Sequence, residues 1–188
     1  MDHYIDLHLP PDPEFPAHQL LSTLYGKLHH ALVRLHRDDI GVSFPGHNDA
    51  TPSLGTHLRL HGNSAALSGL IAEPWLGGLS GLVQQSSVQA VPGIAQYRLV
   101  SRVQAKSSPE RLRRRAMRRH GIDAHTARER IPDSAAESLT LPFVQVASSS
   151  TGQPHFHLYI RHGPIRVESA AGTFNSYGLS RDATIPWF

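Results

Sequence analysis

Six arginines are concentrated in residues 111–119, and their spacing is the clearest chemical signal in the sequence. On a helix, residues three and four positions apart lie on the same face. The arginines that share one face by this spacing are Arg111, Arg114, Arg115 and Arg118. With Glu110 as the one acid nearby, these like charges repel one another unless an anion neutralises them. Guanidinium groups match phosphate geometry, so the pattern favours a helix that binds nucleic acid over a solvated surface helix.

The charge of the whole chain supports this interpretation. Residues 98–119 hold nine basic residues and one acid, a net charge of +8, whereas the other 166 residues hold nine basic and fourteen acidic residues, a net charge of −5. Sixteen of the eighteen basic residues are arginine. An arginine stripe on an acidic body suits a polyanion, and nucleic acid is favoured over the alternative, an anionic membrane surface.

Two polar residues precede the arginine stretch at strand spacing. Arg102 and Gln104 alternate with Val103, so a strand would direct both side chains to one side. Arginine pairs with O6 and N7 of guanine, and glutamine pairs with N6 and N7 of adenine, although such residues are also ordinary on protein surfaces. The major groove of duplex RNA is normally too narrow for these contacts, so base reading requires a groove opened at a helix end or beside a loop.

The chain has 14 histidines, but they form no recognisable set of metal ligands. It lacks the HExxH motif, and His155 with His157 lacks a third ligand, so we expect neither a metal site nor a cofactor. His29 and His30 lie in a predicted helix, where His30 falls opposite the leucine face and His29 falls at the edge of that face. Packing could hold the His29 ring beside a cleft, either for proton transfer or as a structural residue.

The segment SSSTGQPHF, residues 148–156, combines hydroxyls, a glycine and an aromatic residue beside a predicted strand. Clusters of this kind commonly form polar hairpin loops. In a nucleic-acid-binding protein, the same loop could hold a ribose hydroxyl and a phosphate, with Phe156 stacked on the end of a base pair.

The elements that must position these residues follow a regular order in the first half of the chain. Alternating and helical apolar spacings predict a strand, a long helix, two strands, a helix that begins at Asn63 or Ser64, and a fourth strand. Their ranges are 3–9, 16–36, 40–44, 58–60, 64–71 and 83–91. The order β-α-β-β-α-β matches the ferredoxin-like split βαβ unit, a frequent scaffold for RNA binding.

The second half predicts a divergent mixed α/β arrangement. Residues 97–105 alternate as one strand, a helix over 108–120 begins with a capping box from Ser107 to Glu110, and Gly121 ends it. A shorter helix runs from Asp123 to near Pro132, and strands follow at FVQV, HFHLYIR and IRVES. The predicted fold class is therefore α+β, with a ferredoxin-like domain over 1–95 and an RNA-binding half over 96–188.

Composition limits the other possibilities. A chain of 188 residues with 39% apolar residues can bury a core, and the absence of cysteine excludes disulfides, iron–sulfur clusters and a cysteine nucleophile. The acidic N-terminus does not resemble a signal peptide, and the uncharged residues 74–97 are too often interrupted for a membrane span. We therefore expect a cytoplasmic protein that neither enters nor binds a membrane.

The sequence resembles the CRISPR-repeat endoribonuclease family of type I-F systems over nearly its whole length. The resemblance rests on MDHYIDLHLPPDPEFP, YGKLHHAL, IGVSFP, VSRVQAKSSPERLRRRAMRRH, STGQ, RHGP, YGLS and the terminal PWF. It implies an enzyme with a ferredoxin-like domain and an arginine-rich helix that binds the RNA stem-loop of each repeat. It also implies metal-independent cleavage at the 3′ base of the stem by the ribose 2′-hydroxyl, which leaves a 2′,3′-cyclic phosphate.

The resemblance also implies roles for individual residues. His29 matches the catalytic histidine as general base or acid, Ser148 matches the catalytic serine that holds the ribose, and Tyr177 matches the tyrosine that orients the histidine. The RNA-binding positions it implies are Arg102, Gln104, Arg114, Arg115, Arg118, Arg119, His120, Ser150, Thr151 and Phe156, to which the helical spacing adds Arg111. The sequence departs from the family at Pro154, an added residue that bears on the assignments of Ser148 and Phe156.

Two other functions compete with cleavage by the 2′-hydroxyl. A noncatalytic RNA-hairpin-binding subunit of a CRISPR effector complex would bind the repeat without cutting it. A metal-dependent nuclease would lose activity in a chelator. The resemblance implies that the enzyme retains the mature crRNA and remains a subunit of a type I-F surveillance complex.

Overall fold

The computed structural model describes residues 1–104, 109–133, 139–147 and 156–188. The chain forms two compact units. The main unit comprises residues 1–103 and 141–188, and the helical unit comprises residues 104–140. These units are defined by internal packing, and the functional division at residue 95 stays a prediction.

The helix α1 (Ala17–Arg34) carries the apolar stripe that the sequence predicts. It begins after Pro16 and ends before His36, whose φ of 51° is the left-handed conformation that ends many helices. The side chains that it buries include Leu21, Leu24, Leu28 and Leu32. One face of α1 is therefore fixed in the core, and the positions beside that face are fixed with it.

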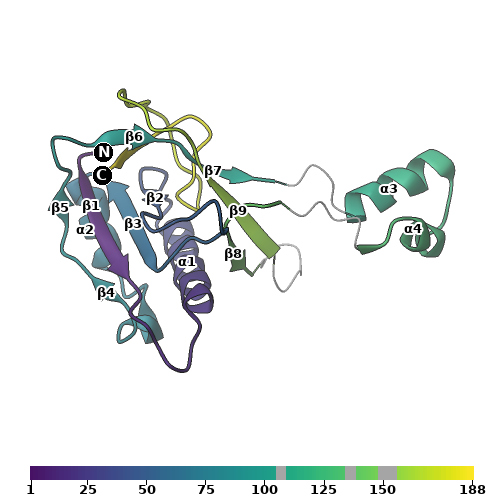
Figure 1. Ribbon diagram of the computed structural model, residues 1–188, viewed down its shortest axis with the longest axis horizontal. Helices are drawn as coiled ribbons and strands as arrows, with labels where there is room; N and C mark the ends of the chain where they lie inside the picture. Colours follow the sequence, from purple (N-terminus) through teal and green to yellow (C-terminus); the bar gives the residue numbers. More distant parts are fainter. Residues whose placement is uncertain (105–108, 134–138, 148–155) are drawn as a thin grey trace. The chain divides into compact units, whose positions relative to one another are not determined.

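The N-terminal sheet has the predicted ferredoxin-like topology (Figure 1). The strands β1 (His3–His8), β2 (Gly41–Ser43), β3 (His57–Gly62) and β4 (Gln84–Gln85) lie in the order β2-β3-β1-β4, and β5 (Gln89–Ala90) also pairs with β1. The helix α2 (Ser64–Ile71) is capped by Asn63, whose side chain accepts the Ala66 N–H. The apolar side chains of β1 and β3 share one core with those of α1 and α2, which confirms the α+β class.

The predicted fourth strand is interrupted. β4 and β5 both pair with β1, but residues 86–88 between them do not continue the ladder. The Ser86 hydroxyl instead accepts the Asp6 N–H, and the Ser86 N–H donates to the Asp6 carbonyl. A side chain thus replaces part of the backbone pairing, which the alternation of apolar residues does not reveal. The short helix η1 (Gly77–Leu79) precedes this edge.

The prediction of one strand over 97–105 is wrong. β6 (Gln96–Arg98) pairs with β10 (Ile185–Trp187), whereas β7 (Val100–Val103) belongs to the sheet β7-β9-β8 with β9 (Phe156–His162) and β8 (Phe143–Val146). The chain changes sheets at Leu99, whose carbonyl accepts the Gly163 N–H. The prediction of a strand at IRVES is also wrong, since residues 165–169 form only an isolated bridge from Arg166 to Tyr97.

The chain termini meet on the face of the N-terminal sheet opposite its leucine side chains. The Arg59 guanidinium donates to both oxygens of the Asp6 carboxylate and to the Phe188 carbonyl. It also lies 4.0 Å from the centroid of the Phe188 ring and 4.7 Å from that of Tyr4. Figure 1 shows the two ends of the chain side by side. The C-terminal residues are therefore part of the sheet's packing.

The helical unit contains α3 (Pro109–His120) and α4 (Ala124–Arg130). Gly121 ends α3 with φ +62°, and the Asp123 side chain caps α4 by accepting the Thr126 N–H. Both predicted helices are confirmed over their described residues; Ser107 of the predicted capping box lies outside them. Within the described ranges, no helix is long and apolar enough to cross a membrane.

Candidate functional site

The candidate catalytic histidine is held by a pair of hydrogen bonds from one face of α1. Tyr25 and His29 lie one helical turn apart, and both face the loop of residues 175–178. The Tyr25 hydroxyl donates to the Tyr177 carbonyl at 2.7 Å, and His29 Nδ1 lies 2.8 Å from the Ser176 carbonyl oxygen. Since both acceptors are backbone oxygens, the loop cannot move without losing its contacts to the helix.

The loop is itself tied to the N-terminal sheet. The Val42 N–H donates to the Gly178 carbonyl, and the Asn175 side chain accepts the N–H groups of Tyr177 and Leu179. Gly178 has φ +69°, and a Cβ atom there would lie 2.6 Å from a Val42 side-chain carbon. A glycine is therefore required at 178 by both conformation and space.

The ring of Tyr177 covers the His29 ring. Their centroids are 3.9 Å apart and their planes differ by 8°. Burial lowers the pKa of His29 and outweighs the opposing effect of the hydrogen bond to Ser176. Burial likewise raises the pKa of Tyr177, so its phenol keeps its proton at neutral pH. The two side chains form a neutral stack.

The hydrogen bond to Ser176 fixes the tautomer of His29. A carbonyl oxygen only accepts, so Nδ1 must carry the proton of the neutral ring and Nε2 must carry the lone pair. Within the described residues, Nε2 has no hydrogen-bond partner. His29 therefore offers a proton acceptor at neutral pH, whereas the neighbouring His30 is exposed on the helix.

Arg102 and Phe156 lie together on the sheet β7-β9-β8. Arg102 is exposed on β7, and Phe156 begins the adjacent strand β9. The Arg102 guanidinium carbon lies 5.5 Å from the centroid of the Phe156 ring. This distance permits a cation–π contact, which would hold the flexible arginine side chain over the aromatic face. Gln104 belongs to the helical unit, so the structure does not place it relative to Arg102.

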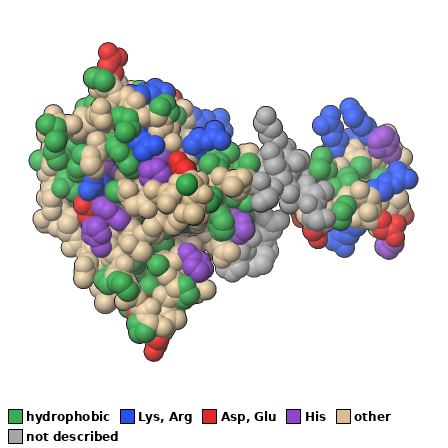
Figure 2. All heavy atoms as spheres, viewed as in Figure 1, with side chains coloured by type: hydrophobic (Ala, Val, Ile, Leu, Met, Phe, Trp, Pro, Cys, Tyr) green, Lys and Arg blue, Asp and Glu red, His purple; other side chains and the backbone are tan. Residues whose placement is uncertain are grey.

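The arginine face of α3 forms as the spacing predicts. The exposed side chains that line a hollow of about 180 Å³ are Arg111, Arg114, Arg115 and Arg118. Arg119 and His120 are exposed in the last turn of the same helix. Figure 2 shows basic side chains over this unit. α3 has no fully buried residue, so its surface is available to a ligand along most of its length.

Arg113 differs from the arginines of that face. Its guanidinium donates to the Ile131 carbonyl at 2.8 Å and to Asp133 at 2.7 Å, and its side chain is 14% exposed. Arg113 thus holds α3 against the chain that follows α4. Sequence spacing separates it correctly from the arginine face, but nothing in the sequence indicates its structural partners.

Three predicted site residues lie outside the described residues: Ser148, Ser150 and Thr151. The added residue Pro154 and His155 of the rejected metal pair lie outside them too. His157 of the rejected metal pair is described, and its ring stacks on Phe143 at 4.0 Å. Sequence reasoning missed Tyr25, Asn175 and Ser176 as positioning residues. The spacing of Tyr25 four residues before His29, and the Asn and Gly of NSYGLS, were the signals available.

Comparison with known proteins defines the class to which this fold and site belong. Residues 4–188 match the model of the CRISPR-associated protein family Cas_Csy4, and the chain belongs to that family. It is 54% identical to the CRISPR-associated endonuclease Cas6/Csy4 of Pseudomonas aeruginosa (strain UCBPP-PA14) over 188 residues, which are 100% of both chains. It is 45% identical to the CRISPR-associated endonuclease Cas6/Csy4 of Escherichia coli (strain UTI89 / UPEC), again over 100% of both chains. The family resemblance predicted from the sequence is confirmed.

The stack of His29 and Tyr177 generates the first prediction. Replacing Tyr177 with Ala exposes the imidazole to water, so the lowered pKa of His29 should rise toward its ordinary value of about 6.5. Tyr177→Phe keeps the covering ring and should leave the pKa nearly unchanged. Titration of the His29 ring protons by NMR measures both. Equal pKa values in Tyr177→Ala and in the unmodified protein would contradict a role of the ring in desolvation.

Proposed function

We propose that this protein is a metal-independent endoribonuclease that cleaves CRISPR repeat RNA at the 3′ base of its stem-loop. The observation that carries the proposal is the held, neutral His29, with Nδ1 at the Ser176 carbonyl and Nε2 left as acceptor. Membership of the Cas_Csy4 family and the names of the relatives support endonuclease activity and CRISPR RNA as substrate.

In the proposed reaction, RNA supplies its own nucleophile. His29 Nε2 takes the proton of the ribose 2′-hydroxyl before the scissile phosphate. The 2′-oxygen then forms a bond to phosphorus, and the bond from phosphorus to the 5′-oxygen breaks. The 5′-oxygen takes a proton from solvent water and His29 returns its proton to solvent, so that a 2′,3′-cyclic phosphate and a 5′-hydroxyl are formed and the neutral histidine is restored. The protein needs only to align the two oxygens in line and to transfer protons, and no water has to be activated.

The roles of the neighbouring residues follow from this step. Tyr177 orients His29 by covering its ring, as the stacking distance of 3.9 Å supports. Ser148 is proposed to hold the ribose, and Ser150 and Thr151 to lie near the scissile phosphate. These serine and threonine assignments rest on the family resemblance.

RNA binding is proposed to divide between phosphate contacts and base contacts. The exposed arginines of α3, with Arg119 and His120, contact the stem and supply affinity that does not depend on sequence. Arg102 and Gln104 read bases low in the stem, and Phe156 stacks beneath the terminal pair. The contact of Arg102 with Phe156 supports placing both beside that pair.

The enzyme is proposed to keep the mature crRNA bound and to remain in a type I-F surveillance complex, in the cytoplasm. The alternative is a noncatalytic RNA-hairpin-binding subunit of a CRISPR effector complex. The held and desolvated His29 favours catalysis, because hairpin binding alone does not require a neutral imidazole with a free acceptor nitrogen.

The two adjacent histidines provide a matched test of the catalytic assignment. His29→Ala should abolish cleavage and retain hairpin binding, because proton transfer acts on the transition state. His30→Ala should have little effect on either. For the unmodified protein, the rate should fall as pH drops through the lowered pKa of His29, since protonation removes the acceptor. Single-turnover cleavage and gel-shift binding measure these effects. Equal losses of cleavage in both variants would reject the assignment.

The substrate's own oxygen tests the reaction type. Replacing the 2′-hydroxyl before the scissile phosphate with hydrogen removes the nucleophile, so cleavage should stop. Binding should persist, since one lost hydrogen bond costs about 1 kcal/mol. EDTA should leave cleavage of the all-ribose hairpin intact. Cleavage of the 2′-deoxy hairpin at the same bond, or a product without the cyclic phosphate, would instead indicate a hydrolytic nuclease.

The arginine face of α3 can be tested separately from catalysis. Arg115→Ala should weaken binding to all hairpins and reduce the salt dependence of log K by about 1, because one phosphate contact is lost. Arg128→Ala removes the same charge from an exposed position on α4 and serves as the control. Fluorescence anisotropy across a range of salt concentrations gives both slopes. If Arg128→Ala changes the slope as much as Arg115→Ala does, the face makes no specific phosphate contact.

A further inference from the structure

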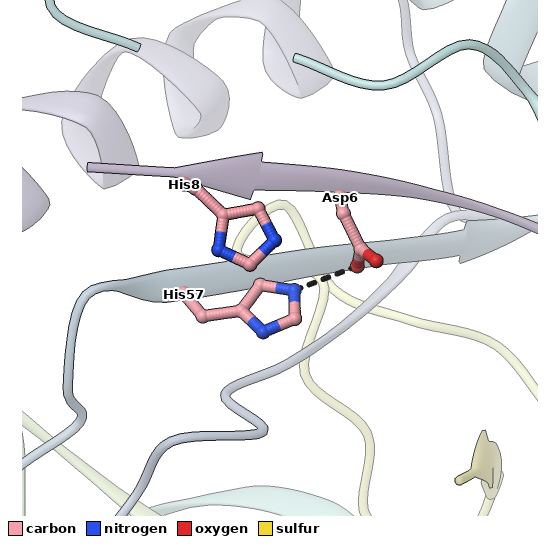
Figure 3. Close-up of side chains that lie close together, drawn as sticks. All are labelled: Asp6, His8 and His57. Atoms are coloured by element: carbon pink, nitrogen blue, oxygen red, sulfur yellow. Dashed lines mark hydrogen bonds and ion pairs between the residues drawn. The ribbon is translucent and has the colours of Figure 1, made fainter. Parts of the chain in front are cut away.

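A second cluster of chemically active side chains lies in the main unit, on the face of the N-terminal sheet that carries Arg59. Asp6 and His8 alternate along β1, so both side chains lie on one face of the sheet. His57 lies directly across from His8 on the neighbouring strand β3. Figure 3 shows the three side chains gathered over these two strands. The pairing register alone thus brings together residues that are about 50 positions apart in the sequence.

The donor atoms of the cluster are close enough to share one ion. One ligand atom from each of Asp6, His8 and His57 lies within 4.8 Å of the other two. His57 Nε2 is 2.7 Å from Asp6 Oδ1, and the two imidazole centroids are 4.0 Å apart. His8 is exposed, whereas the side chains of Asp6 and His57 are each 16% exposed. The cluster is therefore ordered on one side and open to solvent on the other.

We propose that Asp6, His8 and His57 bind a divalent first-row transition-metal ion, with Zn²⁺ the best match. Two imidazoles and a carboxylate are ligands that Zn²⁺ accepts, and three protein ligands leave the fourth tetrahedral position for water. Ca²⁺ and Mg²⁺ are disfavoured because they prefer sites built from oxygen ligands. Two ligands from alternate positions of one strand and a third from its neighbour leave the solvent side of the sheet free for that water.

The surroundings of Asp6 favour its charged form. His57 and Arg59 donate hydrogen bonds to its carboxylate, and a carboxylate accepts such charge-assisted bonds as an anion. An anionic carboxylate and a neutral imidazole are the ligating forms of these side chains.

Binding changes the cluster in two defined ways. His57 Nε2 now donates to Asp6, so its proton must move to Nδ1 before Nε2 can coordinate the ion. The stacked imidazole planes differ by 28°, and because a metal lies in the plane of its imidazole ligand, one ring must also turn about its side-chain bond. Arg59 donates hydrogen bonds to the Asp6 carboxylate from Nε and Nη2, and these bonds would keep the carboxylate oriented toward the ion.

This site is separate from the proposed cleavage chemistry. Ile5 and Leu7 alternate with Asp6 and His8 on β1 and are fully buried in the core that α1 shares. The proposed metal site therefore lies on the opposite face of β1 from those residues. A bound ion would join β1 to β3 and stabilise the pairing, because it binds the folded state and not the unfolded chain.

The test uses the full-length chain without a histidine tag, titrated with Zn²⁺ by calorimetry and with Co²⁺ by absorption spectroscopy. The unmodified protein should bind one ion per chain, with a tetrahedral Co²⁺ spectrum and a raised Tm in Zn²⁺. His8→Gln should weaken the affinity by at least about 10-fold, which is the lower range for loss of even an outer-shell partner. His125→Gln is the control, because its side chain is 84% exposed in the helical unit.

Two results would overturn the proposal. One is the absence of saturable binding at submillimolar Zn²⁺ by the unmodified protein. The other is an equal affinity of His8→Gln and His125→Gln, which would show that the ion is held by other histidines. Because His8 is exposed, its replacement should not prevent folding, and circular dichroism of the variant checks this directly. RNA cleavage by His8→Gln should be unchanged, so failure of the metal site would leave the proposed endoribonuclease function untouched.

Discussion

The hydrogen bond from the Tyr25 hydroxyl to the Tyr177 carbonyl is the constraint on which the candidate site depends. Tyr25 is completely buried, and burial raises the pKa of its phenol, so the hydroxyl remains a donor. Loss of this donor would leave a carbonyl without its partner, at a cost of about 1–3 kcal/mol if no water replaced it. The bond fixes the distance between the loop and α1, and at that distance the Tyr177 ring contacts the His29 ring.

The same hydrogen bond shows that the site combines residues from near both ends of the main unit's sequence. His29 comes from the first helix, whereas Ser176 and Tyr177 come from the last part of the chain, about 150 residues later. The Val42 N–H donates a hydrogen bond to the Gly178 carbonyl of the loop, and Arg59 donates one to the Phe188 carbonyl at the chain end. A loss of pairing in the N-terminal sheet would therefore displace the loop and expose His29.

The sequence predicted those features that depend on local spacing. Apolar periodicity identified α1, the cap predicted at Asn63 or Ser64 identified the start of α2, and the spacing of the arginines identified the exposed face of α3. The position of His29 at the edge of the leucine face also follows from helical geometry. The family resemblance supplied Tyr177, which spacing alone would not have selected. The predictions of the helices and of the arginine face succeeded because each depends on residues within a few turns of one another.

The features that the sequence did not predict depend on pairing between distant segments. The strand pattern of 97–105 is regular, yet the chain changes partners at Leu99 from β10 to β9. The cluster of Asp6, His8 and His57 exists only because His8 pairs with His57 in the register of β1 and β3. A shift of that register by one residue would turn His57 to the other face of the sheet. Neither the alternation of apolar residues nor the composition specifies which residues of β1 and β3 pair, so the cluster could be found only in the folded chain.

The two units differ in net charge. The helical unit holds nine basic and five acidic residues, whereas the main unit holds nine basic and ten acidic residues and is nearly neutral. A strongly positive field around His29 would lower its pKa further and weaken it as a base, since efficient proton transfer favours a pKa near the working pH. The helical unit therefore carries the net positive charge of the chain, whereas the unit that holds the proposed base His29 is nearly neutral, and the substrate brings the nucleophile.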